Sequence, residues 1–458
     1  MTGWWAMVFS PTQSPNLGMT FPPLLSNTGH ECSHTSHPQR AAYQRGWWQR
    51  DRGDRGESWM STSNRKNLYI LAFSLVVVML GFGIVIPIMP FYVEQLGAGG
   101  TELGLLVASY AVMRLICGPI WGSLSDRVGR KPVLMVGIFG YGITMILFGL
   151  ATELWMLFVF RVLSGILSSA TSPTTMAYIG DSTSERERGQ GMGILGAAVG
   201  VGTIIGPGLG GLLAGENLAV PFFIAGGMSF LALLLVWLLL PESLSTDERQ
   251  AVAEKPRLQA KVVWQAVSGS IGSLLVMAFL ASFGLTAFFG IFGLYALQKY
   301  NAGPEAVGMI MMVFGLVTAL AQGLLTGPLT KRWGEAAVIQ GALVATAAGF
   351  LAIALAGAFT AFLLAIGLFT LATALLAPAV SALTSRQTTL EQGLTMGLSN
   401  AAQSLGRIAG PLLGGIAFDL YIEGPNYIGA GVMFVGFLIS LFTIAGERAT
   451  TRETFGSN

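Results

Sequence analysis

Apolar runs of about 20 residues recur along the chain from Leu68 onward, and short polar segments separate them. A helix of about 20 apolar residues crosses the roughly 30 Å hydrocarbon core of a bilayer. The pattern therefore predicts an all-α integral membrane protein. The twelve expected membrane-spanning helices are 68–92, 103–122, 132–151, 154–179, 190–213, 220–240, 272–297, 304–326, 336–356, 360–384, 394–417 and 427–445.

The composition agrees with a membrane location, because 53% of the residues are hydrophobic and 10% are charged, against roughly 25% charged residues in soluble domains. These values exclude an ordinary soluble enzyme. The net charge of +2 provides no basic surface for nucleic acid, so no nucleic-acid partner is expected. The two cysteines, Cys32 and Cys117, allow no disulfide framework and no zinc cluster, and no metal or other cofactor is expected.

Residues 1–66 differ from the rest of the chain, because they contain all three histidines and lack a helical period. Cys32, His34 and His37 are closely spaced, and such residues could form a metal-binding tail. The alternative, which we favour, is a disordered or spurious extension, with Met60 as a natural start.

Lysine and arginine residues concentrate in the loops on one side of the predicted helices. If the segment before the first helix is cytoplasmic, fourteen of them fall in the inner loops and tail, and one, Lys299, falls in the outer loops. Cytoplasmic loops of membrane proteins carry an excess of Lys and Arg. We therefore expect both termini in the cytoplasm, with the protein in an inner or plasma membrane.

A polar stretch at 242–268 divides the predicted helices into two sets of six, and the two sets repeat each other. GSLSDRVGRK from Gly122 matches GPLTKRWGEA from Gly327, and the glycine-rich segment from Met192 matches that from Met396. Parallel repeats of this kind place a substrate site near the membrane midplane, between the halves. The expected parts are two pseudo-symmetric six-helix bundles at 67–241 and 269–446, a cytoplasmic linker at 242–268 and a cytoplasmic tail at 447–458.

The loop that begins at Gly122 resembles the signature loop of the major facilitator superfamily, and the resemblance covers essentially all of residues 67–458. The resemblance implies a monomeric transporter in which this loop latches the cytoplasmic side in the outward-open state. The alternative is that its charges only orient the loops. In the second half, Lys331 and Glu335 replace the first half's Asp126 and Arg130, so the counterpart latch is altered. The expected latch residues are Gly122, Asp126, Arg127, Gly129, Arg130 and Lys131.

The predicted helix 190–213 carries a pattern that resembles the antiporter signature of drug-efflux members of this family. Glycines on one helix face allow close backbone approach, and Pro207 removes an amide and bends the helix. We expect a tight but breakable seam between the two halves; the alternative is generic packing of a glycine-rich helix. The expected seam residues are Gly193, Gly202, Gly206, Pro207, Gly210 and Gly211.

Two further segments, IPIMPFY and AYIGDSTSERERGQGMG, resemble the tetracycline-resistance type of drug:proton antiporter, or equally a broader multidrug or metabolite exporter of that branch. Arg161 matches the family position of an intramembrane arginine associated with proton transfer. Because arginine does not release a proton, it would tune a nearby carboxylate or water; otherwise it is a structural hydrogen-bond hub. After residue 66, no Asp, Glu or His lies in the middle of a predicted helix. Glu94 and Asp181, near helix ends, are therefore the expected proton carriers, unless they are surface carboxylates.

An apolar cavity is expected between the halves, and it suits a hydrophobic or amphipathic ligand better than a sugar. Arg114 and Arg407 are embedded in predicted helices, where they could contact an anionic substrate or cap carbonyl groups. The other expected cavity residues are Phe289, Tyr295, Gln322, Asn400 and Gln403.

These features favour a secondary antiporter that exports drug-like amphipathic compounds in exchange for protons, with lipid, protons and a small molecule as partners. The alternative is a uniporter or exporter of an anionic small metabolite that binds the embedded arginines. The sequence contains no GxxxxGK[ST] loop, so ATP-driven pumping by this chain is not expected. A membrane enzyme or receptor lacks support, because there is no catalytic histidine and no pair of intramembrane carboxylates.

Overall fold

The computed structural model describes residues 62–183, 185–215, 217–244, 271–387 and 392–455, and every regular element among them is a helix. A helix satisfies its backbone N–H and C=O groups internally, which a bilayer requires because its core offers no water. The expected all-α membrane protein is confirmed. The predicted extension, with its possible metal ligands, lies outside the described residues, apart from residues 62–66, which begin the first helix.

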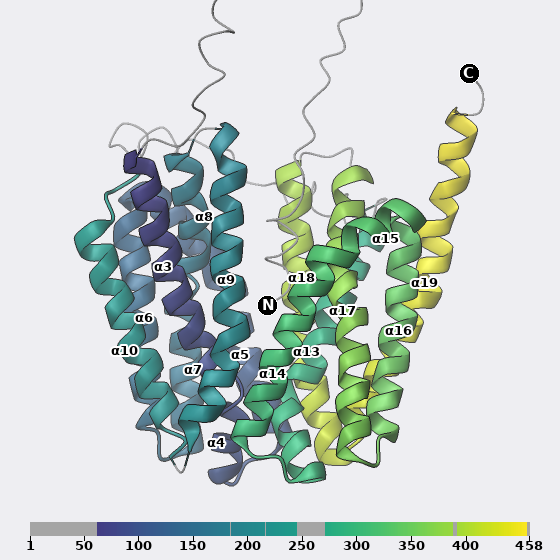
Figure 1. Ribbon diagram of the computed structural model, residues 1–458, viewed down its shortest axis with the longest axis horizontal. Coiled ribbons are helices and arrows are strands. Elements are labelled where there is room, and N and C mark those ends of the chain that lie inside the picture. The colour runs from purple at the N-terminus through teal and green to yellow at the C-terminus, as the bar shows by residue number, and fades with distance from the viewer. Residues whose placement is uncertain (1–61, 184, 216, 245–270, 388–391, 456–458) are drawn as a thin grey trace, which may run out of the picture. The chain divides into compact units, whose positions relative to one another are not determined.

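The first half of the fold runs from α3 to α10 (Figure 1). Its helices are α3 (Thr62–Val85), α4 (Met89–Gln95), α5 (Gly100–Val128), α6 (Arg130–Gly149), α7 (Leu154–Ser168), α8 (Thr171–Ser182), α9 (Glu185–Ala214) and α10 (Val220–Leu239).

The second half runs from α13 to α19 and contains one π-helical turn. Its elements are α13 (Gly272–Tyr300), α14 (Pro304–Leu320), the π-helix η3 (Ala321–Leu325), α15 (Thr326–Trp333), α16 (Glu335–Leu355), α17 (Phe359–Gln387), α18 (Gln392–Leu420) and α19 (Gly424–Phe455).

Three predicted membrane helices are not continuous α-helices in the structure. The span 68–92 breaks next to Pro87, which has no N–H to donate to the helical ladder, and α4 begins just after it. The span 154–179 divides between α7 and α8. The span 304–326 contains the turn η3 and continues as α15. All twelve predicted spans therefore coincide with helices, but periodicity alone did not reveal these interruptions.

One predicted span is more polar than the others. Eleven helical segments among the described residues are long and apolar enough to cross a membrane, and α18, at the predicted span 394–417, is not one of them. It has 29 residues, so its length suffices, but it carries Asn400, Gln403 and Arg407. These polar groups are tolerated because α18 packs between α13 and α5 instead of facing lipid on every side.

The helices form two bundles, α3–α10 and α13–α19, which meet mainly through two helix pairs, α5 with α18 and α9 with α14 (Figure 1). The expected two-bundle architecture is confirmed. We call the end where α5 passes into α6 the Arg130 side, and the opposite end, where α18 finishes, the Asp419 side. The last helix continues to Phe455, so the described part of the predicted tail 447–458 is helical.

Candidate transport site

A cavity of about 820 Å³ lies between the two halves, and helices of both halves line it. Its wall is mainly apolar and includes Phe289 of α13 and Phe314 of α14, whose ring centroids are 4.1 Å apart. Among the described residues that line it are three arginines and no Asp, Glu, Lys or His. The lining contains five of the expected cavity or proton-transfer residues, namely Arg114, Arg161, Phe289, Asn400 and Arg407.

Arg161, on α7, is buried in the cavity wall, with 7% of its surface exposed. Its guanidinium carbon lies 4.5 Å from the centre of the Tyr110 ring, and this cation–π contact offsets part of the cost of losing water. Its Nε atom has no hydrogen-bond partner among the described residues, and the buried hydroxyl of Tyr141 has none either. Arg161 therefore gives the cavity wall a positive charge that no lining carboxylate neutralises.

Arg114 on α5 and Arg407 on α18 add two further positive charges, one from each half. The Arg114 guanidinium carbon lies 5.8 Å from the centre of the Tyr110 ring. Arg407 Nη2 donates a long hydrogen bond of 3.3 Å to Gln403 Oε1, and its Nε has no partner in the described part of the chain. Both guanidinium groups line the same cavity.

Three residues expected in the cavity are not among those that line it. Gln322 lies in the π-helical turn, where its Nε2 donates to the Ala374 carbonyl oxygen over 3.2 Å. Gln403 is buried and contacts the cavity only through Arg407. Tyr295 lies six residues after Phe289 on α13, a rotation of about 240° around the helix axis. It therefore faces away from the cavity.

Tyr295 instead belongs to a buried polar network at the Asp419 side. Its hydroxyl donates to Glu423 Oε2 over 2.7 Å, and Lys299 Nζ pairs with the other oxygen of this carboxylate. Asn426 Nδ2 also donates to Glu423, over 3.2 Å. Lys299 was expected in an outer loop, but it lies in the last turn of α13 and contacts this network. The spacing of four between Tyr295 and Lys299, which puts both on one helix face, was the available signal.

Most of the glycine pattern of α9 packs within the first half, which differs from the expected seam. Gly202, Gly206 and Gly210 are four residues apart and share one helix face, and in the structure this face contacts α3. A β-carbon added at Gly206 would lie 2.7 Å from the Cα atom of Gly83. A β-carbon added at Gly193 would meet nothing within 4 Å.

Two of the six expected seam residues, Pro207 and Gly211, lie on a neighbouring helix face and contact α14, and Ile204 and Gly208 contact it as well. A β-carbon added at Gly211 would lie 2.5 Å from the carbonyl oxygen of Pro304 on α14. One added at Gly308 would lie 2.5 Å from the carbonyl oxygen of Pro207. The α9/α14 seam between the halves therefore rests on backbone contact at two of the six expected residues.

The α5/α18 seam has similar backbone packing and also an acidic cap. A β-carbon added at Gly104 of α5 would collide with the carbonyl group of Pro411 on α18. Asp419 of α18 accepts hydrogen bonds from the N–H groups of Gly100 and Thr101, each 2.7 Å long. A carboxylate is stabilised at a helix N-terminus by the unpaired N–H groups and the helix dipole. Asp419 and Gly100 are 319 positions apart, so no local sequence pattern predicts this contact.

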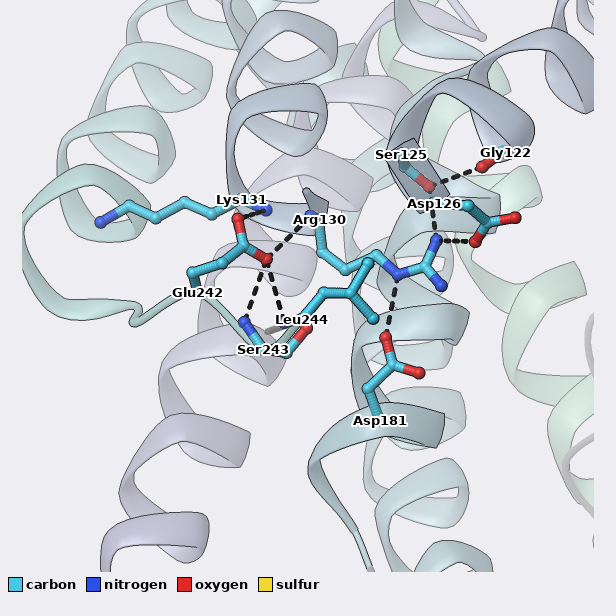
Figure 2. A network of polar contacts seen from close by, with 9 residues as sticks. All are labelled: Gly122, Ser125, Asp126, Arg130, Lys131, Asp181, Glu242, Ser243 and Leu244. Carbon is cyan, nitrogen blue, oxygen red and sulfur yellow. Dashed lines mark hydrogen bonds and ion pairs between the residues drawn. The ribbon is translucent and has the colours of Figure 1, made fainter. Parts of the chain in front are cut away.

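Arg130 is the centre of a polar network at the other end of the first half (Figure 2). Its side chain is 8% exposed and pairs with Asp126. Its Nε donates to Asp181 Oδ2 of α8 over 2.9 Å, and its Nη1 donates to Ser125 Oγ over 2.7 Å. The guanidinium group thus ties the end of α5 to the end of α8.

Glu242, which follows α10, caps the beginning of α6 in the same network (Figure 2). Its Oε1 accepts a hydrogen bond from the Arg130 N–H over 2.8 Å, and its Oε2 accepts one from the Lys131 N–H over 3.2 Å. Gly129, with a φ of 118°, supplies the turn from α5 into α6, and this conformation favours glycine. Sequence analysis assigned Glu242 to the linker and missed its role.

The remaining expected latch residues lie around this network. Lys131 Nζ donates to the Trp237 carbonyl oxygen over 2.8 Å, Gly122 lines the cavity, and Arg127 is exposed. The partners that the described residues provide for Arg130 all belong to the first half. In this conformation the network therefore stabilises one half and does not join the two.

The two acidic residues expected to carry protons lie on opposite sides of the protein. Asp181 pairs with Arg130 and so belongs to the polar network. Glu94 is partly exposed at the end of α4, near the Asp419 side. Neither residue lines the cavity, whereas Arg161 does.

One family matches the chain twice. It is described as the Major Facilitator Superfamily, and the matches cover residues 71–273 and 274–456. The two matches correspond to the two halves of the structure.

The chain is also similar to known transport and resistance proteins. It is 33% identical over 380 residues to Multidrug resistance protein 2 of Bacillus subtilis, covering 82% of this chain and 95% of that protein. It is 29% identical over 378 residues to Quinolone resistance protein NorA of Staphylococcus aureus, covering 82% of this chain and 96% of that protein. A solved bacterial homologue of the human lysosomal transporter Spinster, inward-facing and unoccupied, has a TM-score of 0.67 and 16% identity, covering 84% of this chain and 96% of that one.

Proposed function

The chain belongs to the major facilitator superfamily and is a transporter, not an enzyme, and on this premise we propose that it exports hydrophobic or amphipathic drug-like compounds by alternating access. The observation that carries the proposal is the mainly apolar cavity, to which both halves contribute. A site shared by two halves opens to one side or the other when the halves rock around it. The similarity to proteins named for multidrug and quinolone resistance supports this class of cargo.

The protein would lie in an inner or plasma membrane. In the proposed orientation, its Arg130 side faces the cytoplasm. Most lysines and arginines of the loops lie at this end of the helices, and a cytoplasmic location of such residues is the rule in membrane proteins. The described helices begin with α3 and finish with α19 at this same end (Figure 1). Cargo would then enter the cavity from the cytoplasm and leave past the Asp419 side.

Opening the Asp419 side requires the two seams between the halves to part. At the α5/α18 seam, the Asp419 carboxylate must leave the two N–H groups of α5. At the α9/α14 seam, Gly211 must leave the backbone of Pro304. At these positions the contacts involve backbone atoms of at least one helix, so the seams can be tight when closed and still separate.

Gly211→Leu tests this transport cycle directly. The new side chain would not fit against Pro304, so the Asp419 side could not close and export should fall by about tenfold or more, since overpacking costs about 1–3 kcal/mol and about 1.4 kcal/mol corresponds to a tenfold change in rate. Gly193→Leu is the matched control, because a β-carbon there meets nothing within 4 Å. Export would be measured in proteoliposomes after correct insertion has been checked. Equal export by the two variants would contradict the role of the α9/α14 seam.

Proton coupling is part of the same proposal. Among the described residues the cavity has no carboxylate in its lining, so the proton-binding groups would lie at the ends, at Asp181 and Glu94, while Arg161 would set the charge of the wall. Loss of the negative charge of Asp181 would remove one of the two carboxylates that hold Arg130, and this would loosen the contact between the ends of α5 and α8 within the first half.

The experiment for coupling uses purified protein in liposomes with an imposed pH gradient. Uptake of tetracycline and of a lipophilic cationic dye should follow the gradient and stop when a protonophore is added. Asp181→Asn and Glu94→Gln should reduce proton movement per molecule transported, whereas a variant that merely folds poorly would reduce both fluxes together. Gradient-independent transport of either compound would rule out proton coupling but leave the transporter itself in place.

A further inference from the structure

We propose that Arg114 and Arg407 bind the anionic group of transported compounds, so that among amphipathic compounds the cavity prefers organic anions with a carboxylate or sulfonate on an apolar, aromatic body. The inference rests on the proposed transport function and names the substrate class of the same cavity. Arg114 comes from α5 and Arg407 from α18, so the anion is held by both halves at once.

The charge of the cavity is the first argument. Three arginines line the cavity, and none of the described lining residues is acidic. A positive charge kept away from water is costly unless an opposite charge or good hydrogen bonds compensate it. Arg114 and Arg407 face the same cavity from the two halves, and no acidic residue of the described lining compensates them. An anion bound in the cavity would neutralise the wall, which a cationic or neutral compound would not do.

The unused hydrogen-bond donors are the second argument. A guanidinium group has five N–H donors. Arg407 uses one of them, in a long bond to the amide oxygen of Gln403, and its Nε is buried without a partner. Arg161 is also buried with an unpartnered Nε, but Tyr110 covers its guanidinium group at 4.5 Å. Arg161 therefore contributes charge, while Arg114 and Arg407 are better placed to contact the anion.

The aromatic side chains of the cavity wall would bind the apolar part of the ligand. Phe289 and Phe314 meet edge to face next to the cavity, and Phe82 lies 5.8 Å from Tyr110, measured between ring centroids. Apolar compounds with planar rings bury their surface well against such side chains. A small hydrophilic anion would leave this surface unused, so the cavity favours an amphipathic anion.

Two probes that share one skeleton and differ only in the anionic group measure how much this group contributes to binding. The probes are 8-anilinonaphthalene-1-sulfonate and the neutral N-phenyl-1-naphthylamine, which lacks the sulfonate. Binding would be measured by equilibrium dialysis of protein in nanodiscs made of zwitterionic lipid, with empty nanodiscs as the blank. Arg114→Gln and Arg407→Gln are the test variants. Arg332→Gln removes one exposed positive charge outside the cavity and is the matched control.

We expect the sulfonate to bind at least about tenfold more tightly than the neutral probe, and each test variant to lose about tenfold for the sulfonate alone, as expected for a lost charge-assisted hydrogen bond. Arg332→Gln should change neither affinity. Equal affinity for both probes, or an equal loss for both in the test variants, would overturn the anion site. Full displacement of the sulfonate by anionic lipid added to the nanodiscs would reassign the site to a lipid headgroup.

Transport assays separate this inference from the proposed function. Gradient-driven uptake of the neutral probe, unaffected by the two arginine substitutions, would support export but contradict the anion site. Tight, arginine-dependent binding of the sulfonate without transport of any probe would support the anion site and contradict export. Melting temperatures of the variants within a few degrees of the parent protein would show that the losses are not due to unfolding.

Discussion

The two halves of the protein use the same turn at the Arg130 side with opposite charges. In the first half, Gly129 leads into α6 and Arg130 pairs with Asp181. In the second half, Gly334, with a φ of 79°, leads into α16 and Glu335 pairs with Arg386 over 2.8 Å. The glycine and both members of the pair each lie 205 positions later than their counterparts. The turn and the presence of an ion pair are thus retained, whereas the sign of each charge is not.

The two pairs differ in burial and in their effect on the helix that follows. Arg130 and Asp181 are 8% and 26% exposed, whereas their counterparts Glu335 and Arg386 are 13% and 67% exposed. Arg130 also has a second carboxylate partner, Asp126. Glu335 is an acidic residue in the first turn of its helix, which the helix dipole favours. Helix α6 begins with two basic residues, which the dipole disfavours, and Glu242 supplies the missing negative charge. The first half therefore needs extra residues to stabilise the same turn, so we expect it to be more sensitive to substitution.

The largest effect is expected for Arg130→Glu. The substitution would place a third carboxylate beside Asp126 and Asp181 and remove their buried partner, which should cost about 3 kcal/mol or more. The measurement is the melting temperature of the purified protein, together with export in proteoliposomes.

A rescue variant sharpens this prediction. The triple substitution of Asp126→Lys, Arg130→Glu and Asp181→Arg reproduces the charges that the second half has at Lys331, Glu335 and Arg386. If the turn accepts either sign, the triple variant should recover most of the melting temperature lost in Arg130→Glu. A triple variant that is no more stable than the single one would show that the two turns are not equivalent.

An intermediate effect is expected for Glu242→Gln. The amide keeps the shape of the side chain but loses the charge that compensates Arg130 and Lys131 at the start of α6. We expect a loss of about 1–2 kcal/mol, measured as a lower melting temperature in detergent. No change would mean that hydrogen bonding without charge is sufficient at this helix end.

The smallest effect is expected for Glu335→Gln. Its partner Arg386 is largely exposed, and ion pairs with such exposure contribute at most about 1 kcal/mol. The melting temperature and the export rate should therefore remain close to those of the parent protein. A loss as large as that of Arg130→Glu would contradict the comparison between the two turns.

Some residues of the candidate site could be predicted from the sequence, and others could not. Arg114 and Arg407 are embedded in predicted membrane helices, which suggested that they could contact a substrate in the cavity, and both line it. Tyr295 was expected there on composition, but its direction depends on how α13 is rotated, and it faces Glu423. Asp181 was considered by itself, and only the fold brings it to Arg130.

The sequence by itself determined the membrane location and the twelve helical spans, because hydropathy and periodicity are local properties set by the transfer of side chains from water to lipid. It also indicated the twofold repeat, through matching segments, and the family, through the resemblance of the loop at Gly122 to a signature motif. The tertiary structure decided which face of each helix meets which neighbour. Gly206 faces α3 while Gly211 faces α14, although both belong to one motif, and Asp419 caps a helix of the other half. Such contacts depend on helix rotation and on the docking of the two halves, which arise from the packing of many residues at once.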